Sequence, residues 1–251
     1  MTNTPIGILS GLGPLAGEDV LAKALDYAAT RYGAVEDVDY PDVVLVSHGI
    51  ESFDMTGDVS NGLLAELLVL VAELDTHHPC VIGVACNTAH LFLDELRRRS
   101  RAPIVDLIGE VARVAAEAGE EYLLLSSSTT RSTGLYRQAL ERRGVRFHEV
   151  SSGEQAVVDE IVHLVMAHEL EIAGTAIRHL IDNWKTSPYT AVIAGCTELP
   201  MAFAHSGLAH RIPIIDSNQV LAELLVDAYY FKHGRMPAHS VLVGAGNGGV
   251  S

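Results

Sequence analysis

Two segments of the chain share one pattern around a cysteine. The apolar run VIGVA leads into Cys86, and the run AVIAG leads into Cys196. Each run is short and contains β-branched residues, and each cysteine is followed within two positions by a threonine. This pattern predicts a buried parallel strand that delivers a thiol to the start of a helix. There the helix dipole favours the thiolate and lowers the thiol pKa from about 8.5 towards neutrality.

Two such thiols on opposite sides of one cleft can carry out racemisation. The cysteines are separated by 110 positions, so each can belong to one half of a duplicated α/β body. One thiolate removes a proton from one face of a carbon, and the other thiol returns a proton to the opposite face. Cys80 follows Pro79 at the entrance of a strand, lacks this pattern and is predicted to be structural.

Short polar side chains surround both cysteines. Asn87, Thr88 and Thr197 suit helix N-caps, and they also suit the binding of a carboxylate beside exposed N–H groups. Capping alone explains each of them equally well. A second hydroxyl-rich segment, residues 126–133, follows another predicted strand. It either lines an anion site or forms a polar turn, and its position at the expected cleft favours the site.

Two ionisable residues in the cysteine motifs have two interpretations each. His90 lies four residues after Cys86, and it either steadies the thiolate or caps its own helix. Glu198 lies two residues after Cys196. It opposes thiolate formation if it points inward, or it accepts a hydrogen bond from a substrate amine.

The glycine-rich segment 11–17 superficially resembles a dinucleotide-binding turn. The next predicted strand, however, ends in Ser47, His48 and Gly49, without an acidic residue for a ribose hydroxyl. The segment, including Gly11, is therefore interpreted as a backbone wall of the active site. The 12 histidines contain no zinc-like framework. We expect no metal and no cofactor.

The composition excludes several classes of protein. A formal net charge of −15 argues against nucleic acid and against anionic membrane surfaces. Three cysteines are not a disulfide scaffold, and thiols are easiest to keep reduced in a cytosol. The N-terminal residues lack the pattern of a signal peptide, and the longest apolar run, 63–72, contains Glu66 and is too short to span a bilayer. The sequence predicts a cytoplasmic protein with a small-molecule partner.

Short apolar runs alternate with helical patterns along the chain. This alternation predicts an α/β fold with parallel sheets and helices on both faces. We expect a first lobe over 1–110, with a late helix at 218–233 that packs back on it, and a second lobe over 111–217. The predicted strands are 6–9, 43–47, 81–85, 104–105, 122–126, 146–150, 192–194 and 212–215. The predicted helices are 18–32, 62–74, 89–99, 108–118, 135–143, 155–167, 172–184 and 218–233.

Four motifs resemble the aspartate/glutamate racemase family, the cofactor-independent racemases with two catalytic cysteines. They are GILSGLGPLAG near the N-terminus, ACNTAH around Cys86, TRSTGLY at 130–136, and GCTELP around Cys196, in the family's order. The resemblance implies two Rossmann-like lobes related by pseudo-two-fold symmetry, an active site in the cleft between them, and a homodimer.

The resemblance also implies roles for particular residues. Cys86 and Cys196 are the expected acid/base pair at a carbon α to a carboxylate. Preorganised N–H donors stabilise the carbanion. The residues expected to hold the α-carboxylate and the amine are Asn87, Thr88, Thr130 and Thr197.

The chain departs from the family pattern at two positions. Family members with acidic substrates carry an Arg and a Lys that bind the side-chain carboxylate, and here Met55 and Met166 stand at these positions. A buried carboxylate without a cationic partner is unstable. We therefore expect a substrate with a less acidic side chain. Alternatively, His48 or His168 supplies part of the missing charge, which keeps aspartate and glutamate as candidates.

Two other functions fit the motifs. One is an isomerase or decarboxylase of a small dicarboxylic acid, in which Cys86 acts as a nucleophile. The other is a non-catalytic protein that binds a small metabolite. Binding alone needs neither thiol, so a binding protein is expected to tolerate loss of the cysteines, whereas a racemase is not.

Overall fold

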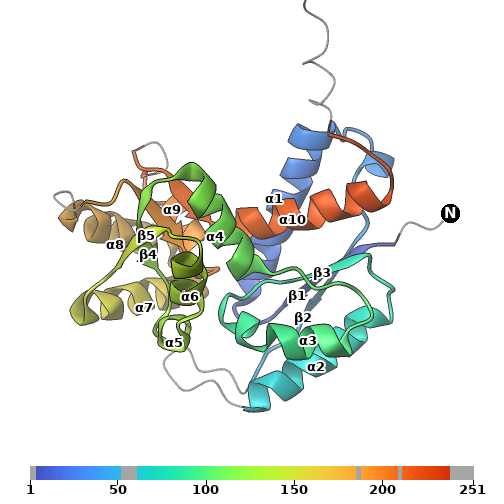
Figure 1. The fold of residues 1–251 in the computed structure, drawn as a ribbon, viewed down its shortest axis with the longest axis horizontal. Coiled ribbons are helices and arrows are strands. Elements are labelled where there is room, and N and C mark those ends of the chain that lie inside the picture. The colour runs from blue at the N-terminus through green and yellow to red at the C-terminus, as the bar shows by residue number, and fades with distance from the viewer. Residues whose placement is uncertain (1–3, 52–60, 185–187, 209–210, 238–251) are drawn as a thin grey trace, which may run out of the picture.

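The structure is a computed structural model that describes residues 4–51, 61–184, 188–208 and 211–237. In this part of the chain, two separate parallel sheets form the centres of two lobes (Figure 1). The first sheet has the strand order β2-β1-β3, and the second has the order β5-β4-β6-β7. The predicted α/β fold with two parallel-sheet lobes is confirmed.

The elements follow one another in nearly strict alternation. Those around the first sheet are β1 (Ile6–Ser10), α1 (Pro14–Tyr32), η1 (Asp37–Asp39), β2 (Val43–Ser47), α2 (Asn61–Asp75), β3 (Val81–Val84), η2 (Thr88–Phe92) and α3 (Leu93–Arg99). Those that follow are α4 (Leu107–Ala118), β4 (Glu121–Leu125), α5 (Ser128–Thr133), α6 (Leu135–Arg142), β5 (Arg146–Glu149), α7 (Ser152–Met166), α8 (Leu170–Asn183), β6 (Ala191–Ala194), α9 (Leu199–Ala204), β7 (Ile214–Asp216) and α10 (Ser217–Lys232).

The two sheets repeat one topology. In each, the first strand lies at the centre, the second pairs on one side, and the third pairs on the other. Ile82 of β3 forms an isolated parallel bridge with Ile104, at the place that β7 occupies beside β6. The segment 104–105 was predicted to be a strand, but it forms only this single bridge and no strand of its own. The matching order means that β3 and β6 occupy equivalent positions, and these are the two strands that lead into the cysteines.

Both faces of the sheets are buried by helices. Along β1, Ile6 and Ile8 pack in one cluster with α1 and α10, whereas Leu9 packs on the opposite side with α2. This alternation follows from the two-residue period of a strand. Apolar residues on both faces explain why the strands are continuous hydrophobic runs rather than alternating ones.

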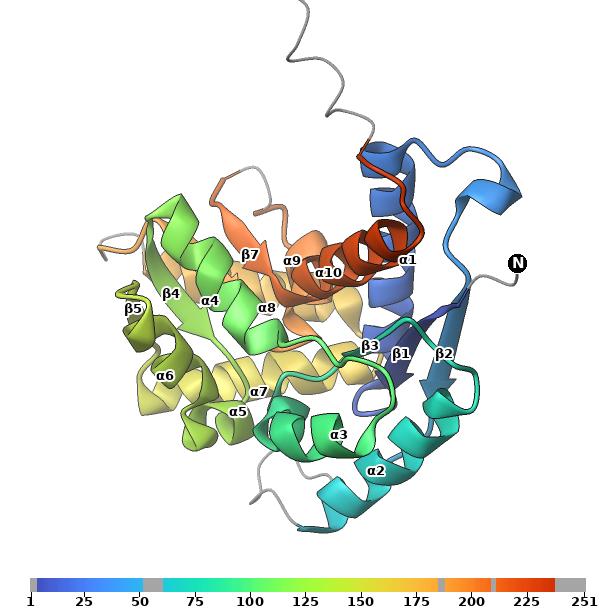
Figure 2. The same cartoon turned by 45° about the vertical axis from the view of Figure 1, so that its right-hand side comes forward.

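The last helix returns to the beginning of the chain. Figure 2 shows α10 beside α1, and α10 also contacts β3 and α4. Gly83 in β3 allows this approach, because a Cβ atom there would lie 2.7 Å from Cδ1 of Leu225. The cluster under α10 also contains residues of β4 and β6, so it joins the two sheets. The predicted boundary between the lobes stays a prediction.

Two features of the helices differ from the prediction. The helix predicted over 89–99 divides into η2 and α3 at Phe92, and the short helices α5 and α9 were not predicted. No helix within the described residues has the length and apolar character needed to cross a membrane.

Candidate active site

The two cysteines lie at equivalent strand ends. Cys86 follows β3 and precedes η2, and Cys196 follows β6 and precedes α9. Their residues are only 4% and 7% exposed, so both thiols are buried. Burial is the main cause that raises the pKa of Cys196, and a negative charge on Cys86 would raise it further, so the two thiols are near enough to interact electrostatically. The duplicated fold thus brings together two thiols that are far apart in the sequence.

Burial determines the protonation state of Cys86. It raises the pKa of this thiol to about 12, while the backbone N–H groups of Ala89 and Thr88 act in the opposite direction. The N–H groups that follow Cys86 therefore lower the pKa of its thiol as expected, but the desolvation of the buried sulfur raises this pKa by more. The prediction that the pKa of Cys86 falls towards neutrality is wrong, because burial raises this pKa and keeps Cys86 a thiol.

Glu198 points inward and contacts the second thiol. The Cys196 Sγ atom donates a hydrogen bond to Oε2 of Glu198 at 3.0 Å, and the Thr197 hydroxyl donates to the same oxygen at 3.0 Å. Burial raises the pKa of Cys196 well above its usual value, and the negative charge of Glu198 raises it further. Burial also raises the pKa of the Glu198 carboxyl. Glu198 therefore points inward, where its negative charge disfavours the Cys196 thiolate and its carboxylate accepts the hydrogen bond from the thiol.

The glycine-rich segment of the first lobe covers this carboxyl group. Gly13 has a φ of 95°, and a Cβ atom there would lie 2.0 Å from Oε1 of Glu198. Gly11 has a φ of 111°, and a Cβ atom there would lie 1.8 Å from the carbonyl oxygen of His48. Both positions therefore require glycine, because a side chain would collide with its surroundings and strain the backbone.

Two threonines connect the lobes directly. The hydroxyl oxygens of Thr88 in η2 and Thr130 in α5 lie 2.6 Å apart. Ser127 caps α5 by accepting a hydrogen bond from the Thr130 N–H at 3.2 Å, and its own hydroxyl donates to Thr130 Oγ1 at 3.0 Å. All three side chains are buried, so the expected carboxylate-binding hydroxyls bind each other in this structure.

Asn87 is fixed by residues from distant parts of the chain. The Tyr136 hydroxyl donates to Oδ1 of Asn87 at 2.5 Å, and Nδ2 of Asn87 donates to the Ser217 hydroxyl at 3.3 Å. Asn218 donates to the Thr197 carbonyl at 2.7 Å and to Asp19 at 2.7 Å. The sequence analysis did not identify Tyr136, Ser217 or Asn218. Tyr136 belongs to the TRSTGLY motif, and this motif was the one sequence feature that could have indicated it.

Two further polar atoms in this region are buried without a partner. Oγ of Ser10, at the end of β1, and Oδ1 of Asn218 make no hydrogen bond within the described residues. Buried polar groups are normally paired, so unpaired ones indicate places where a ligand or water binds. Neither atom was identified from the sequence.

Of the remaining predicted residues, His90 is the one that a described contact brings to a cysteine, and this contact is with the backbone. Met55 lies outside the described residues. Met166 ends α7 with 39% of its surface exposed. His48 is exposed, and its Nε2 lies 3.4 Å from Oε2 of Glu73. His168 follows α7 with a φ of 62°.

His90 is buried, and its Nδ1 lies 2.9 Å from the backbone carbonyl of Cys86 rather than from the thiol. In the described part of the chain, no group of three His, Cys, Asp or Glu side chains is arranged to hold a metal ion.

Comparison with known proteins places the chain among the isomerases that racemise amino acids. Residues 9–225 match the family model Asp/Glu/Hydantoin racemase, and the chain belongs to this family. It is 24% identical over 224 residues to the broad specificity amino-acid racemase RacX of Bacillus subtilis, covering 89% of this chain and 97% of that protein. It is 25% identical over 222 residues to a glutamate racemase of Trichormus variabilis, covering 84% and 68% of the two chains.

Solved structures share the fold. An aspartate racemase from Picrophilus torridus superposes with a TM-score of 0.79 at 24% identity, over 90% of this chain and 94% of that one. The glutamate racemase isoform RacE1 from Bacillus anthracis superposes with a TM-score of 0.72 at 16% identity, over 94% and 85% of the two chains. The two-lobed architecture is therefore that of the Asp/Glu racemases.

Proposed function

We propose that the protein is a cofactor-independent amino-acid racemase or epimerase in which Cys86 and Cys196 are the two acid/base groups. The observation that carries this proposal is the pair of buried thiols at equivalent strand ends of two matching sheets, near enough to interact. A reaction that inverts a carbon needs one proton acceptor and one proton donor on opposite faces. Two strand ends related by the internal repeat provide such a pair.

The reaction begins with loss of a proton from one thiol. Cys196 already donates a hydrogen bond to Glu198, so its proton can pass from Sγ to Oε2 of the carboxylate. The resulting thiolate takes the proton from the α-carbon, and Cys86 gives its own proton to the opposite face. Cys196 is then a thiol and Cys86 a thiolate. The other enantiomer reacts by the same steps in reverse.

The substrate carboxylate is proposed to replace the contact between Thr88 and Thr130. The two hydroxyls form a hydrogen bond with each other, and a carboxylate can accept a hydrogen bond from each. The backbone N–H groups that already act on Cys86, those of Thr88 and Ala89, are positioned to stabilise negative charge in the transition state. Because the site is buried, substrate entry requires the lobes to separate at the two threonines.

The substrate is proposed to be an amino acid with a less acidic side chain than aspartate or glutamate. Met55 and Met166 stand in the sequence at the positions of the family's basic residues, and this supports the proposal because a buried side-chain carboxylate needs a cationic partner. The similarity to a racemase named for broad specificity agrees with it. The mechanism needs free thiols, and all three cysteines are free, so we place the reaction in the reducing cytoplasm.

The test is exchange of the α-proton in D₂O, followed by NMR over a panel of L- and D-amino acids. We expect exchange with at least one amino acid in the wild type. Cys86→Ala is expected to abolish exchange from one enantiomer, Cys196→Ala from the other, and each to reduce racemisation by at least 10³-fold. Cys80→Ala is the matched control and should keep full activity, because this buried cysteine lies outside both motifs.

Three results contradict the proposal. If both single variants racemise at the wild-type rate, the two-thiol mechanism is wrong. If no amino acid exchanges but a small dicarboxylic acid is consumed, the isomerase or decarboxylase with a nucleophilic cysteine replaces it. If a ligand binds equally well to wild type and to both variants without turnover, the protein is a metabolite-binding protein.

A further inference from the structure

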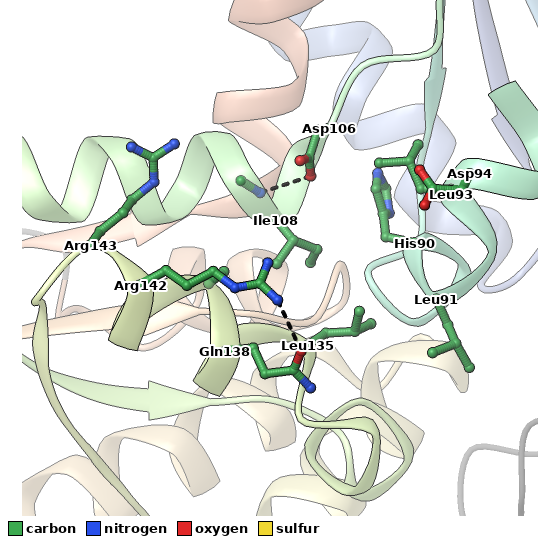
Figure 3. Close-up of a pocket in the computed structure, with 12 residues that line it drawn as sticks. His90, Leu91, Leu93, Asp94, Asp106, Ile108, Leu135, Gln138, Arg142 and Arg143 are labelled. Atoms are coloured by element: carbon green, nitrogen blue, oxygen red, sulfur yellow. Dashed lines mark hydrogen bonds between the residues drawn. The ribbon is translucent and has the colours of Figure 1, made fainter.

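A pocket of about 500 Å³ lies between the lobes and is separate from both thiols (Figure 3). Its lining residues come from η2, α3, the beginning of α4, and α6. Neither Cys86 nor Cys196 lines it. A pocket of this size holds a small metabolite.

One wall of the pocket consists of hydrogen-bond acceptors. His90 is 5% exposed, and its Nδ1 lies 2.9 Å from the backbone carbonyl of Cys86. A carbonyl only accepts, so Nδ1 carries the proton and Nε2 of the neutral ring is an acceptor. Burial lowers the pKa of His90, which keeps the ring neutral. Nε2 has no hydrogen-bond partner of good geometry in the described part of the chain.

Asp106 adds a negative charge beside this nitrogen. Burial lowers the pKa of His90 most; the negative charge of Asp106 and the backbone of Val105 raise it, and the positive charge of Arg97 lowers it, so these groups surround the ring. Asp106 caps α4 through Oδ1, which accepts a hydrogen bond from the Gly109 N–H at 2.8 Å. The second carboxylate oxygen takes no part in this cap. A carboxylate and a bare imidazole nitrogen together form a site for an ammonium group.

The opposite wall carries two positive charges. Arg142 and Arg143 lie at the end of α6, and neither forms an ion pair with another described residue. The one hydrogen bond found for either guanidinium in the described structure joins Arg142 to Gln138 at 3.4 Å. Figure 3 shows Arg142 extending from α6 towards Ile108 and Leu135, with His90 and Asp106 beyond them. Figure 3 shows the guanidinium group of Arg142 directed into the pocket and that of Arg143 pointing away from it, and both residues line the pocket. In a chain of net charge −15, these two cations offer a carboxylate its binding partners.

We propose that this pocket binds a small zwitterion of amino-acid or dipeptide size, distinct from the molecule bound between the cysteines. Its carboxylate lies against Arg142 and Arg143, its ammonium group lies between Asp106 and His90, and Leu91 and Leu135 contact its apolar part. A purely anionic ligand is disfavoured by Asp106, and a purely cationic one by the arginines. His90 also contacts the backbone carbonyl of Cys86 through Nδ1. A ligand in the pocket is therefore in contact with a residue that positions the end of β3, where Cys86 lies.

The test is isothermal titration calorimetry with single L- and D-amino acids and with glycylglycine. We expect at least one of these probes to bind, and Arg142→Ala/Arg143→Ala to weaken that binding at least tenfold. Arg98→Ala/Arg99→Ala is the matched control, because it removes two adjacent exposed arginines of α3 that do not line the pocket. Asp106→Asn keeps a good helix cap while removing the charge, and it should also weaken binding at least tenfold.

Three outcomes overturn the proposal. The first is that no probe binds the wild type. The second is that the Arg142/Arg143 variant binds every probe as tightly as the Arg98/Arg99 control, which assigns all binding to the cysteine site. The third is that inorganic phosphate binds in the pocket and Asp106→Asn strengthens this binding, which identifies an anion site. Loss of α-proton exchange in the cysteine variants leaves the inference untouched, so the two proposals fail separately.

Discussion

At the scale of single residues, the protonation of the two thiols depends on a competition between burial and local donors. A helix N-terminus stabilises a negative charge by about 0.3–1 kcal/mol. Burial raises the pKa of Cys86 from 9.0 to about 12, which corresponds to about 4 kcal/mol in the opposite direction. The thiolate of Cys86 is therefore rare while its sulfur atom is buried. We infer that substrate binding, which brings an ammonium group near the sulfur atoms, is what makes a thiolate accessible.

This competition predicts how stability depends on pH. A thiol whose pKa is higher in the folded state than in the unfolded state favours folding at every pH below the unfolded value. For Cys86 this contribution is complete below pH 9 and is lost between pH 9 and about 12, at about 1.4 kcal/mol per pH unit. Urea unfolding at pH 8, 9 and 10 measures it. Cys86→Ser, which does not titrate in this range, should show a smaller loss, and an equal loss would contradict the assignment.

Glu198 has a separate, testable role as the proton acceptor of Cys196. Glu198→Gln keeps the shape of the side chain but removes its ability to take the thiol proton. We expect at least a tenfold loss at pH 7 of α-proton exchange from the enantiomer that Cys196 deprotonates. The deficit should shrink at pH 10, because the variant also lacks the charge that raises the pKa of Cys196. Equal losses for both enantiomers at every pH would contradict this role.

At the scale of elements, long apolar patterns were readable from the sequence and short polar helices were not. The predicted strands of the two sheets agree with β1–β7 to within about two residues, and the clearest of them, β1, β3 and β6, are buried along their whole length. By contrast, α5 consists almost entirely of Ser and Thr, which are weak helix formers. Its limits are set by the Ser127 cap, by Gly134, and by Asp159, which accepts a hydrogen bond from the Ser128 N–H at 2.8 Å.

In the candidate site, too, local motifs were predictable from the sequence and contacts between distant residues were not. Both cysteines, Asn87, Thr88 and Thr130 were identified because they belong to compact motifs. The partners that orient Asn87 were not, since Tyr136 is 49 positions away and Ser217 is 130 positions away. Nothing in a single sequence specifies contacts over such separations. The direction of the Glu198 side chain likewise depends on Gly13, which comes from the other lobe.

The packing of α10 on β3 gives a prediction at this scale. Leu225→Ala should lower the free energy of unfolding by about 2–5 kcal/mol, because it leaves a cavity against the sheet. Gly83→Ala places a methyl group 2.7 Å from Leu225 Cδ1 and should also destabilise. The double variant should cost less than the sum, since the added methyl group occupies the space that Leu225 vacates. Urea unfolding of all three variants measures this coupling, and strict additivity would contradict the contact.

At the scale of the whole molecule, an exposed apolar surface supports the proposal of a homodimer. Val38, Phe231 and Met236 are 87%, 82% and 74% exposed. Val38 and Met236 are next in sequence to Asp39 and Arg235, which form an ion pair with Oδ1 and Nη2 2.9 Å apart, and Phe231 lies four residues before Arg235. Large exposed apolar side chains on segments joined in this way are candidates for an interaction site.

Light scattering tests this surface. We expect the mass of two chains for the wild type and of one chain for Phe231→Glu, because a buried carboxylate without a partner opposes association. Val69→Glu is a matched control on α2, where Val69 is 65% exposed. A monomeric wild type, or a dimer in the Phe231→Glu variant, would contradict the assignment of this surface.

The position of α10 in the chain also has a consequence for biosynthesis. One face of the first sheet is covered by a helix whose first residue follows the end of β3 by about 130 positions. At about 5–20 residues per second, the ribosome takes on the order of ten seconds to supply it. During that interval the nascent first lobe exposes the apolar surface around Gly83, while the strands and helices of the second lobe are being completed. The lobe that is synthesised first is thus the one that finishes folding last.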